Sequence, residues 1–170
     1  MLRRRDILLA GASGVAILAA LRYGLMAPTP PAMADETFEV THSDAEWRKL
    51  LTSEQYKVLR QSGTEAPFSS PLDFERRAGI FDCAGCQLPL YSSATKYDSH
   101  TGWPSFWKPL DNAIGETKDT TFGMTRTEVH CRRCGGHMGH VFDDGPKPTG
   151  LRYCIDGFGL VFHPAGPQAS

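Results

Sequence analysis

The sequence predicts a mainly β protein of the α+β class, in which a pair of short N-terminal helices packs on antiparallel β-sheets. Three observations support this fold class. Two capping boxes, each leading into apolar residues, lie in the chain before residue 63. Short β-prone runs, separated by Gly, Pro and Asp, occupy the chain from Gly79 onward. Four of the five cysteines form two Cys-x-x-Cys pairs, a pattern typical of a small metal-stabilised domain.

Two helices are expected in quick succession after residue 42. Ser43 is followed three residues later by Glu46, and Thr52 by Gln55, so each pair matches a capping box. Gly63 is expected to end the second helix. The apolar residues that follow the two boxes are Trp47, Leu50, Leu51, Tyr56, Val58 and Leu59.

Five short runs are predicted to form strands, because each is rich in β-branched and aromatic residues. The turn-forming residues 143–150 are expected to lie beside the strand that carries Cys154. The predicted strands are residues 79–81, 122–129, 140–142, 152–155 and 160–162.

The first 34 residues have the composition of an export signal. Arg3, Arg4 and Arg5 precede an apolar run over residues 7–21, which is short for the roughly 20 residues that span a bilayer. A small-x-small cleavage site follows at residues 32–34. We therefore expect twin-arginine export to the periplasm, a mature domain of residues 35–170 and no stable membrane insertion after cleavage. An uncleaved membrane anchor is the alternative.

The mature domain is expected to be mildly acidic. The chain has 18 basic and 19 acidic side chains, and residues 1–34 contain four arginines and one aspartate. Their removal leaves 14 basic and 18 acidic side chains, a formal charge of −4. This balance argues against nucleic acid as a partner. The remaining 136 of the 170 residues suit one domain, and nothing in them requires more than a monomer.

Four cysteines are candidate ligands for one structural zinc ion. Cys83 and Cys86 form one pair, Cys131 and Cys134 form the other, and 44 residues separate the pairs. Each pair can supply two thiolates to a tetrahedral site. Two disulfides or two thioredoxin-like redox pairs are the alternatives, which the lack of a proline-flanked pair at a helix start disfavours. The fifth cysteine, Cys154, remains unpaired.

Cys154 is a candidate nucleophile. Arg152 lies two residues away, which on a strand places both side chains on one face. His137 and His140 offer two imidazoles that can donate protons near neutral pH, and Trp103 belongs to an aromatic loop suited to holding a small apolar group. The structural alternatives are an inert buried thiol, zinc-ligating or structural histidines, and a core tryptophan.

Four segments taken together resemble the signature sequences of the B-type methionine sulfoxide reductases. The resemblance extends from about residue 47 to residue 162, with both cysteine pairs in between. It implies two antiparallel β-sheets with short N-terminal helices, and reduction of the R epimer of methionine sulfoxide in proteins or peptides. The segments are GTEAPFS at 63–69, GWPSF at 102–106, HMGHVFDDGP at 137–146 and PTGLRYCI at 148–155.

The resemblance also implies a role for each candidate residue. The Cys154 thiolate would attack the sulfoxide sulfur and become a sulfenic acid. His137 and His140 would assist protonation of the departing oxygen. Trp103 would pack against the S-methyl group, and Phe142 would complete an apolar wall.

Two departures from the family pattern change the expected chemistry. Thr101, preceded by His100, occupies the place where many members have a resolving cysteine, so an external thiol or a thioredoxin-like protein is expected to reduce the sulfenic acid. Asp156 stands where the family usually has Asn. Its carboxylate could raise the pKa of Cys154 or, when protonated, serve as an extra acid, whereas Arg152 is expected to favour the thiolate.

Two other functions are compatible with parts of this pattern. One is a secreted zinc-stabilised binding module without activity. The presence of Cys154, of two histidines and of Trp103 argues against it. The other is a thiol peroxidase, which would also form a sulfenic acid, but an aromatic loop sized for a methyl group favours a sulfoxide substrate.

Overall fold

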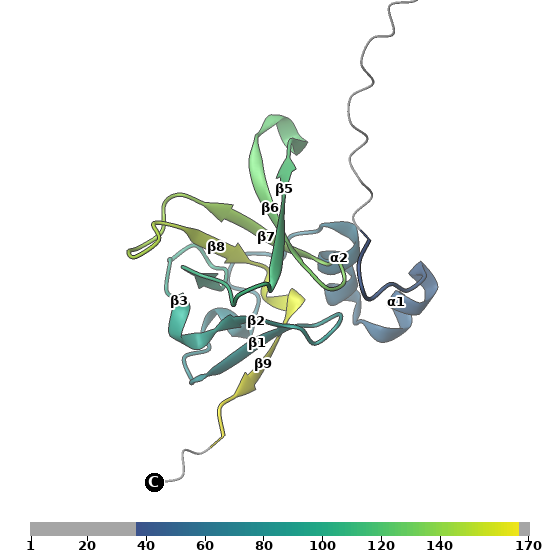
Figure 1. Cartoon of the computed structure of the whole chain (residues 1–170), viewed down its shortest axis with the longest axis horizontal. Helices are drawn as coiled ribbons and strands as arrows, with labels where there is room; N and C mark the ends of the chain where they lie inside the picture. Colours follow the sequence, from purple (N-terminus) through teal and green to yellow (C-terminus); the bar gives the residue numbers. More distant parts are fainter. Residues whose placement is uncertain (1–36, 167–170) are drawn as a thin grey trace, which may run out of the picture. The chain divides into compact units, whose positions relative to one another are not determined.

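Residues 37–166 are described by a computed structural model, shown in Figure 1. The export signal expected over residues 1–34 lies outside these described residues. Within residues 37–166, none of the helices combines the length and the apolar character that crossing a membrane requires.

The two predicted helices form where their capping boxes place them. Helix α1 spans Asp44–Leu50 and helix α2 spans Ser53–Gln61. The side chain of Ser43 accepts the backbone N–H of Glu46, whose carboxylate accepts the N–H of Ser43, and the second helix repeats this exchange. Each box satisfies two backbone donors that a helix start leaves unpaired, which explains why such short helices form at these residues.

The second helix ends one residue earlier than expected. Ser62, and not Gly63, adopts the left-handed conformation at the C-cap, with φ 50°. Gly63 follows it and donates its N–H to the carbonyl of Lys57 over 2.9 Å. A Cβ atom on Gly63 would lie 2.8 Å from Cγ of Lys57. The glycine is therefore explained by close packing against the helix, not by a positive φ.

The strands form two antiparallel sheets, which confirms the predicted fold class. The smaller sheet has the order β2-β1-β9, and the larger has the order β3-β4-β8-β7-β6-β5. The smaller sheet consists of β1 (Gly79–Cys83), β2 (Pro89–Ser92) and β9 (Leu160–Pro164). The larger consists of β3 (Lys96–Tyr97), β4 (Ser105–Phe106), β5 (Ile114–Asp119), β6 (Arg126–Cys131), β7 (His137–Phe142) and β8 (Arg152–Ile155).

All five predicted strands are present, but the predicted start of the strand at residues 122–129 is wrong. Residues 122–125 do not pair, because Thr121–Gly123 forms a 3-10 turn in which Phe122 has a φ of 54° and is 90% exposed. Strand β6 begins only at Arg126. Strands β2 to β5 were not predicted. They are short or carry polar residues, so their partner strands define them more than their own pattern does.

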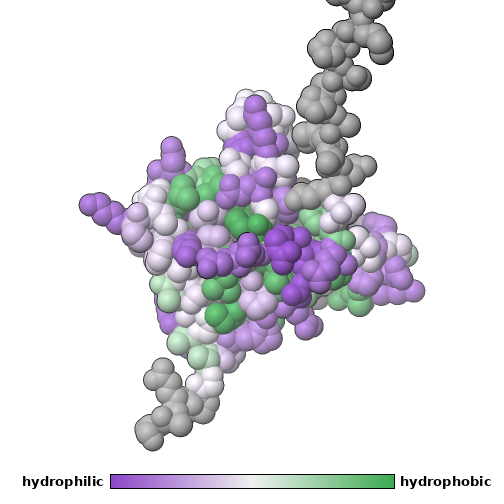
Figure 2. All heavy atoms as spheres, in the orientation of Figure 1, coloured by the Kyte–Doolittle hydropathy of each residue, from purple (hydrophilic) through white to green (hydrophobic). Residues whose placement is uncertain are grey.

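The core lies between the two sheets and is dominated by aromatic rings. Phe81 of β1 contacts Phe106 of β4 edge to face, with ring centroids 5.1 Å apart, and Tyr91 of β2 stacks on Phe106 at 4.3 Å. All three side chains are fully buried. The face drawn in Figure 2 carries mainly hydrophilic residues with small hydrophobic patches between them, as expected where water replaces packing.

A β-bulge in β7 shapes the region around the two candidate histidines. Val129 of β6 pairs with Gly139, whereas the next residue, His130, pairs with His137. Met138 is therefore an extra residue in β7. Bulges of this kind turn the side chains on one side of the extra residue relative to those on the other.

The bulge explains why two histidines three residues apart lie together. In a regular strand His137 and His140 would point to opposite faces. Their ring centroids are instead 5.6 Å apart. Gly139 within the bulge has a φ of 141°, and a Cβ atom there would lie 2.1 Å from the carbonyl oxygen of Cys154. Glycine is required because the backbones of β7 and β8 approach so closely.

Candidate active site and metal centre

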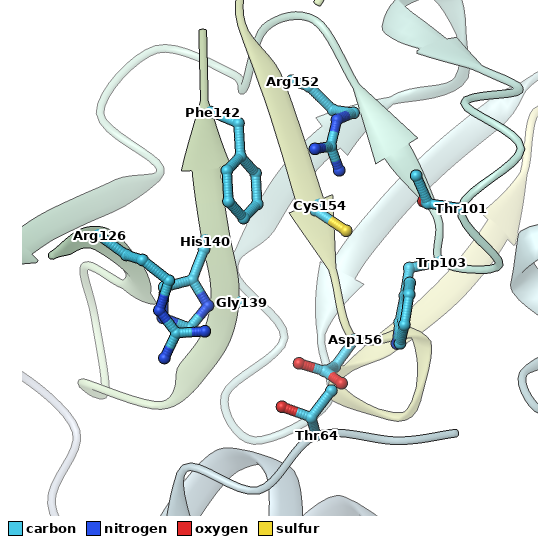
Figure 3. A pocket seen from close by; sticks show the side chains of 10 residues that line it. All are labelled: Thr64, Thr101, Trp103, Arg126, Gly139, His140, Phe142, Arg152, Cys154 and Asp156. Carbon is cyan, nitrogen blue, oxygen red and sulfur yellow. The ribbon is translucent and has the colours of Figure 1, made fainter. Parts of the chain in front are cut away.

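A cavity of about 320 Å³ opens on one face of the larger sheet, at the sulfur of Cys154. In Figure 3, Arg152 and Asp156 lie above and below this sulfur, Phe142 and His140 lie on one side, and Trp103 lies on the other. Every predicted catalytic or substrate-binding residue except His137 lines the cavity. The lining residues are Thr64, Thr101, Trp103, Arg126, Gly139, His140, Phe142, Arg152, Cys154 and Asp156.

Strand pairing holds Cys154 in the middle of the sheet. It lies opposite His140 of β7 on one side and opposite Ser105 of β4 on the other. Burial raises the pKa of its thiol, while the charge of Arg152 and a hydrogen bond with the side chain of Thr101 oppose this effect. The thiolate therefore depends on two specific neighbours to offset the loss of water.

The guanidinium group of Arg152 is held in place from two sides. Its Nε and Nη2 atoms each donate to the carboxylate of Asp144 over 2.8 Å. Its Cζ atom lies 4.4 Å from the centroid of the Phe142 ring. A bidentate ion pair and a cation–π contact together fix both Arg152 and the aromatic wall of the cavity.

A carboxylate that the sequence did not indicate holds His140. Nε2 of His140 donates to Oδ2 of Asp119 over 2.8 Å, so Nδ1 is the ring nitrogen left for a ligand in the cavity. Asp119 also accepts Arg126 at 2.5 Å and the N–H of Thr121 at 2.8 Å. The hydrogen bonds from Thr121, His140 and Arg126 hold the pKa of Asp119 well below its usual range. Burial lowers the pKa of His140, and its bond to Asp119 opposes that shift.

His137 lies beneath the cavity and does not line it. The Nδ1 atom of this buried ring lies 2.6 Å from Oε1 of Glu128, whereas Nε2 lies 3.9 Å from Oδ2 of Asp156, which is too far for a hydrogen bond. Glu128 was also not indicated by the sequence. His137 is therefore held by Glu128 and lies beside Asp156, but it does not line the cavity.

Asp156 and Glu65 are linked through the backbone. Asp156 accepts the N–H of Glu65 over 2.8 Å, and burial raises the pKa of Asp156 to about 6. The carboxylate of Glu65 accepts the N–H groups of Gly157 and Phe158, each at 2.8 Å. Burial raises the pKa of Glu65 to about 7, although these two amides oppose the shift. The carbonyl of Glu65 accepts Nε1 of Trp103 over 3.2 Å, which sets the indole against the cavity.

Thr101, at the position where a resolving cysteine was considered, belongs to a chain of hydroxyl groups. Its Oγ1 lies 2.8 Å from Oγ of Ser99, which lies 2.7 Å from Oγ of Ser105. Ser105 also donates to the carbonyl of Trp103 over 3.0 Å. These bonds hold the Thr101 hydroxyl beside Cys154, where it can stabilise a thiolate but cannot form a disulfide.

The four paired cysteines converge on one point. Their sulfur atoms all lie within 4.8 Å of one another, with 3.7 Å between Cys83 and Cys134 and 3.5 Å between Cys86 and Cys131. A tetrahedron with metal–sulfur bonds of about 2.3 Å has edges of about 3.8 Å, so the sulfur atoms fit zinc. A disulfide needs a separation of about 2.05 Å, and all five cysteines are free thiols.

Both cysteine pairs are presented by the same backbone turn. In each pair, the backbone N–H of the first cysteine donates to the carbonyl of the residue five positions later. The backbone carbonyl of the same cysteine accepts the N–H of the residue four positions later. These distances are 2.9 and 2.8 Å at Cys83, and both are 2.8 Å at Cys131. The residue four positions on, Gln87 or Gly135, has a positive φ. This repeated turn indicates that the two pairs are matching halves of one site. Neither His137 nor His140 belongs to that site.

Comparison with known proteins agrees with this geometry. Residues 51–164 match the family model described as the SelR domain. The chain is 53% identical over 127 residues to "Peptide methionine sulfoxide reductase MsrB" of Agrobacterium fabrum. The aligned residues make up 74% of this chain and 94% of that protein.

Two further relatives carry the same name. The protein of Pseudomonas putida (strain W619) is 56% identical over 120 residues, covering 70% of this chain and 90% of the relative. That of Methanosarcina barkeri is 52% identical over 124 residues, covering 72% of this chain and 87% of the relative. With the family model matching more than half of the chain and the relatives covered almost end to end, the chain belongs to the B-type methionine sulfoxide reductase family.

Proposed function

We propose that this protein reduces methionine-R-sulfoxide in oxidised proteins, with Cys154 as the nucleophile. The observation that carries the proposal is the position of Cys154. It is the cysteine that lies outside the four-sulfur cluster, and its sulfur points into a cavity between aromatic and proton-donating side chains. The family relatives, which are named for this activity, support the reaction class.

The reaction is an oxygen transfer from one sulfur atom to another. The thiolate of Cys154 attacks the sulfoxide sulfur, the sulfoxide oxygen receives a proton, and the oxygen passes to Cys154 as methionine leaves. The products are methionine and a Cys154 sulfenic acid. His140 as the imidazolium and Asp156 as the carboxylic acid border the cavity and are the groups positioned to supply the proton. His137 and Glu128 would act through Asp156.

The aromatic walls suit a methyl thioether. Trp103, whose indole nitrogen is bound by the carbonyl of Glu65, offers a fixed apolar surface on one side of the sulfur. Phe142 offers another on the opposite side, under the guanidinium group of Arg152. A methyl group held between these rings leaves the sulfoxide oxygen toward the polar groups.

An external thiol must complete the cycle. The sulfenic acid of Cys154 needs a second thiol, and Thr101 supplies only a hydroxyl group. The other four cysteines are gathered in the cluster, which we propose holds a single structural zinc ion through Cys83, Cys86, Cys131 and Cys134. A small thiol or a thioredoxin-like protein would therefore attack Cys154 directly.

The first prediction concerns the intermediate. The reduced, zinc-loaded protein is mixed with a methionine-R-sulfoxide peptide and dimedone, without any reductant, and its intact mass is measured. We expect one dimedone adduct that maps to Cys154 and is missing in Cys154→Ser. A loss of two hydrogens would instead identify a resolving cysteine in the cluster. No change with the sulfoxide would favour a binding module, and an adduct only with hydrogen peroxide would favour a thiol peroxidase.

The second prediction concerns Asp156, which has a raised pKa of about 6. It is protonated, and able to donate, below about pH 6, so its contribution to kcat falls as the pH rises through this value. Asp156→Asn should remove this fall in rate near pH 6 from the pH profile of single-turnover reduction. It should also lower the pKa of Cys154, because the carboxylate raises it. The exposed Asp111→Asn is the matched control, and identical profiles for wild type and Asp156→Asn would refute the role.

The third prediction concerns Asp119 as a positioning residue. Asp119→Asn should lower the single-turnover rate by at least about tenfold, because His140 loses the acceptor that fixes its tautomer and orientation. If Asp119 acts through His140, the double variant Asp119→Asn/His140→Gln should be no slower than His140→Gln alone. Additive losses would show that Asp119 acts by another route.

The fourth prediction concerns the metal. Elemental analysis should find one zinc per chain, and Cys83→Ser should lose it. Because metal binding at such a site contributes several kcal/mol to folding, the variant should unfold about 10 °C lower or more. Cys154→Ser is the matched control and should keep both the zinc and the wild-type midpoint. A metal-free wild-type protein with an unchanged midpoint would contradict the assignment.

A further inference from the structure

Two of the exposed phenylalanines lie side by side outside the cavity. Phe68 is 56% exposed and Phe74 is 60% exposed. Their rings are stacked, with centroids 6.5 Å apart and an angle of 24° between the planes. Single exposed apolar residues are common, but two stacked exposed phenylalanines form a small apolar surface that water solvates poorly. We call these two residues the Phe68–Phe74 pair.

The pair adjoins the backbone of the cavity wall. Phe68 donates its N–H to the carbonyl of Gly102 over 2.7 Å. A Cβ atom on Gly102 would lie 3.0 Å from Cδ2 of the Phe68 ring. Gly102 connects Thr101 and Trp103, which both line the cavity. The aromatic pair therefore continues the surface of the active site on the side of Trp103.

The backbone of Phe68 supports a functional reading of its exposure. Its φ is 63°, in the left-handed region that bulky side chains rarely adopt. The bond to Gly102 and the N–H of Ser69, which donates to the carbonyl of Ala66, hold this conformation. The Phe68 ring is exposed, so its strained backbone does not add packing to the core. Residues with such strained backbone conformations concentrate at binding sites.

Two arginines near the aromatic pair are already bound to carboxylates. Arg77 contacts Glu75 at 2.6 Å, and Arg76 contacts Asp98 at 3.4 Å. A partner that covers the aromatic pair would thus gain apolar contact without having to neutralise Arg76 or Arg77. This arrangement favours an apolar partner surface over a strongly charged one.

We propose that the Phe68–Phe74 pair is the docking surface for a protein dithiol of the Cys-x-x-Cys class, which reduces the Cys154 sulfenic acid. The inference rests on the proposed function, because only an enzyme without its own resolving thiol needs such a partner at the cavity. A constant reductant can match a fixed aromatic surface, whereas oxidised methionines occur in unlike sequence contexts. Redox encounters commonly bury less than about 1,200 Å², so a small surface suffices.

The reaction at this surface balances without a further reagent. One thiolate of the partner attacks the sulfur of the Cys154 sulfenic acid, forming a mixed disulfide, and the hydroxyl leaves as water after taking up one proton. The second thiol of the partner then attacks the partner's first cysteine sulfur, which is bonded to Cys154 in the mixed disulfide. Cys154 is released as the thiol, and the partner leaves as a disulfide.

The experiment compares two reductants on the zinc-loaded protein. The variants are Phe68→Asn, which tolerates the left-handed backbone, Phe74→Ser, and both together. Leu50→Ser on α1 is the matched control, because Leu50 is 59% exposed. Each protein is assayed with dithiothreitol, and with a bacterial thioredoxin recycled by NADPH and thioredoxin reductase. The substrates are N-acetyl-methionine-R-sulfoxide and an oxidised peptide.

With thioredoxin, the double variant should show a KM for the reductant raised at least about fivefold, as expected when buried aromatic contacts are removed. With dithiothreitol, its turnover and its KM for both substrates should match those of wild type and Leu50→Ser. An unchanged KM for thioredoxin would overturn the proposal. A raised KM for the peptide alone would overturn it too, by assigning the surface to the substrate chain. Failure of wild type to turn over with dithiothreitol would instead refute the proposed function.

Discussion

The active site depends on one buried carboxylic residue, Glu65. Its carboxylate accepts the N–H groups of Gly157 and Phe158, its own N–H is bound by Asp156, and its carbonyl binds the indole of Trp103. Three segments far apart in the sequence thus meet on one residue. Burial makes these bonds strong, because losing any partner would leave a polar group without water. The wall of the cavity, the side chain of Asp156 and the turn after β8 are consequently positioned together.

The groups around Cys154 have opposing effects on the pKa of its thiol. Burial raises the pKa of the thiol, and Asp156 raises it further, while Arg152 and Thr101 lower it. The same burial lowers the pKa of His140 and raises that of Asp156. A low-water cavity thus disfavours a charged nucleophile and favours a protonated carboxyl group. This division suits oxygen transfer, which needs a proton donor next to the attacking sulfur.

Sequence signals succeeded where the interactions are local and failed where they are not. The capping boxes at Ser43 and Thr52 each join residues three positions apart, so pattern alone predicted them. Asp119 reaches His140 over 21 positions and Glu65 reaches Asp156 over 91, and neither contact leaves a local pattern. Six cavity residues could be named from the family segments, namely Trp103, His140, Phe142, Arg152, Cys154 and Asp156, whereas Thr64 and Arg126 of the same cavity were not.

The metal cluster and the reactive cysteine are chemically interdependent on the proposed cycle. Four free thiols would each be able to attack a sulfenic acid or be oxidised themselves. Held as ligands of zinc, those of Cys83, Cys86, Cys131 and Cys134 are committed to folding and withdrawn from exchange. Thr101 beside Cys154 excludes the remaining internal route. On the proposed cycle, reduction of Cys154 would then require a thiol from outside the chain, which would tie turnover to the supply of that thiol and not to the chain's own cysteines.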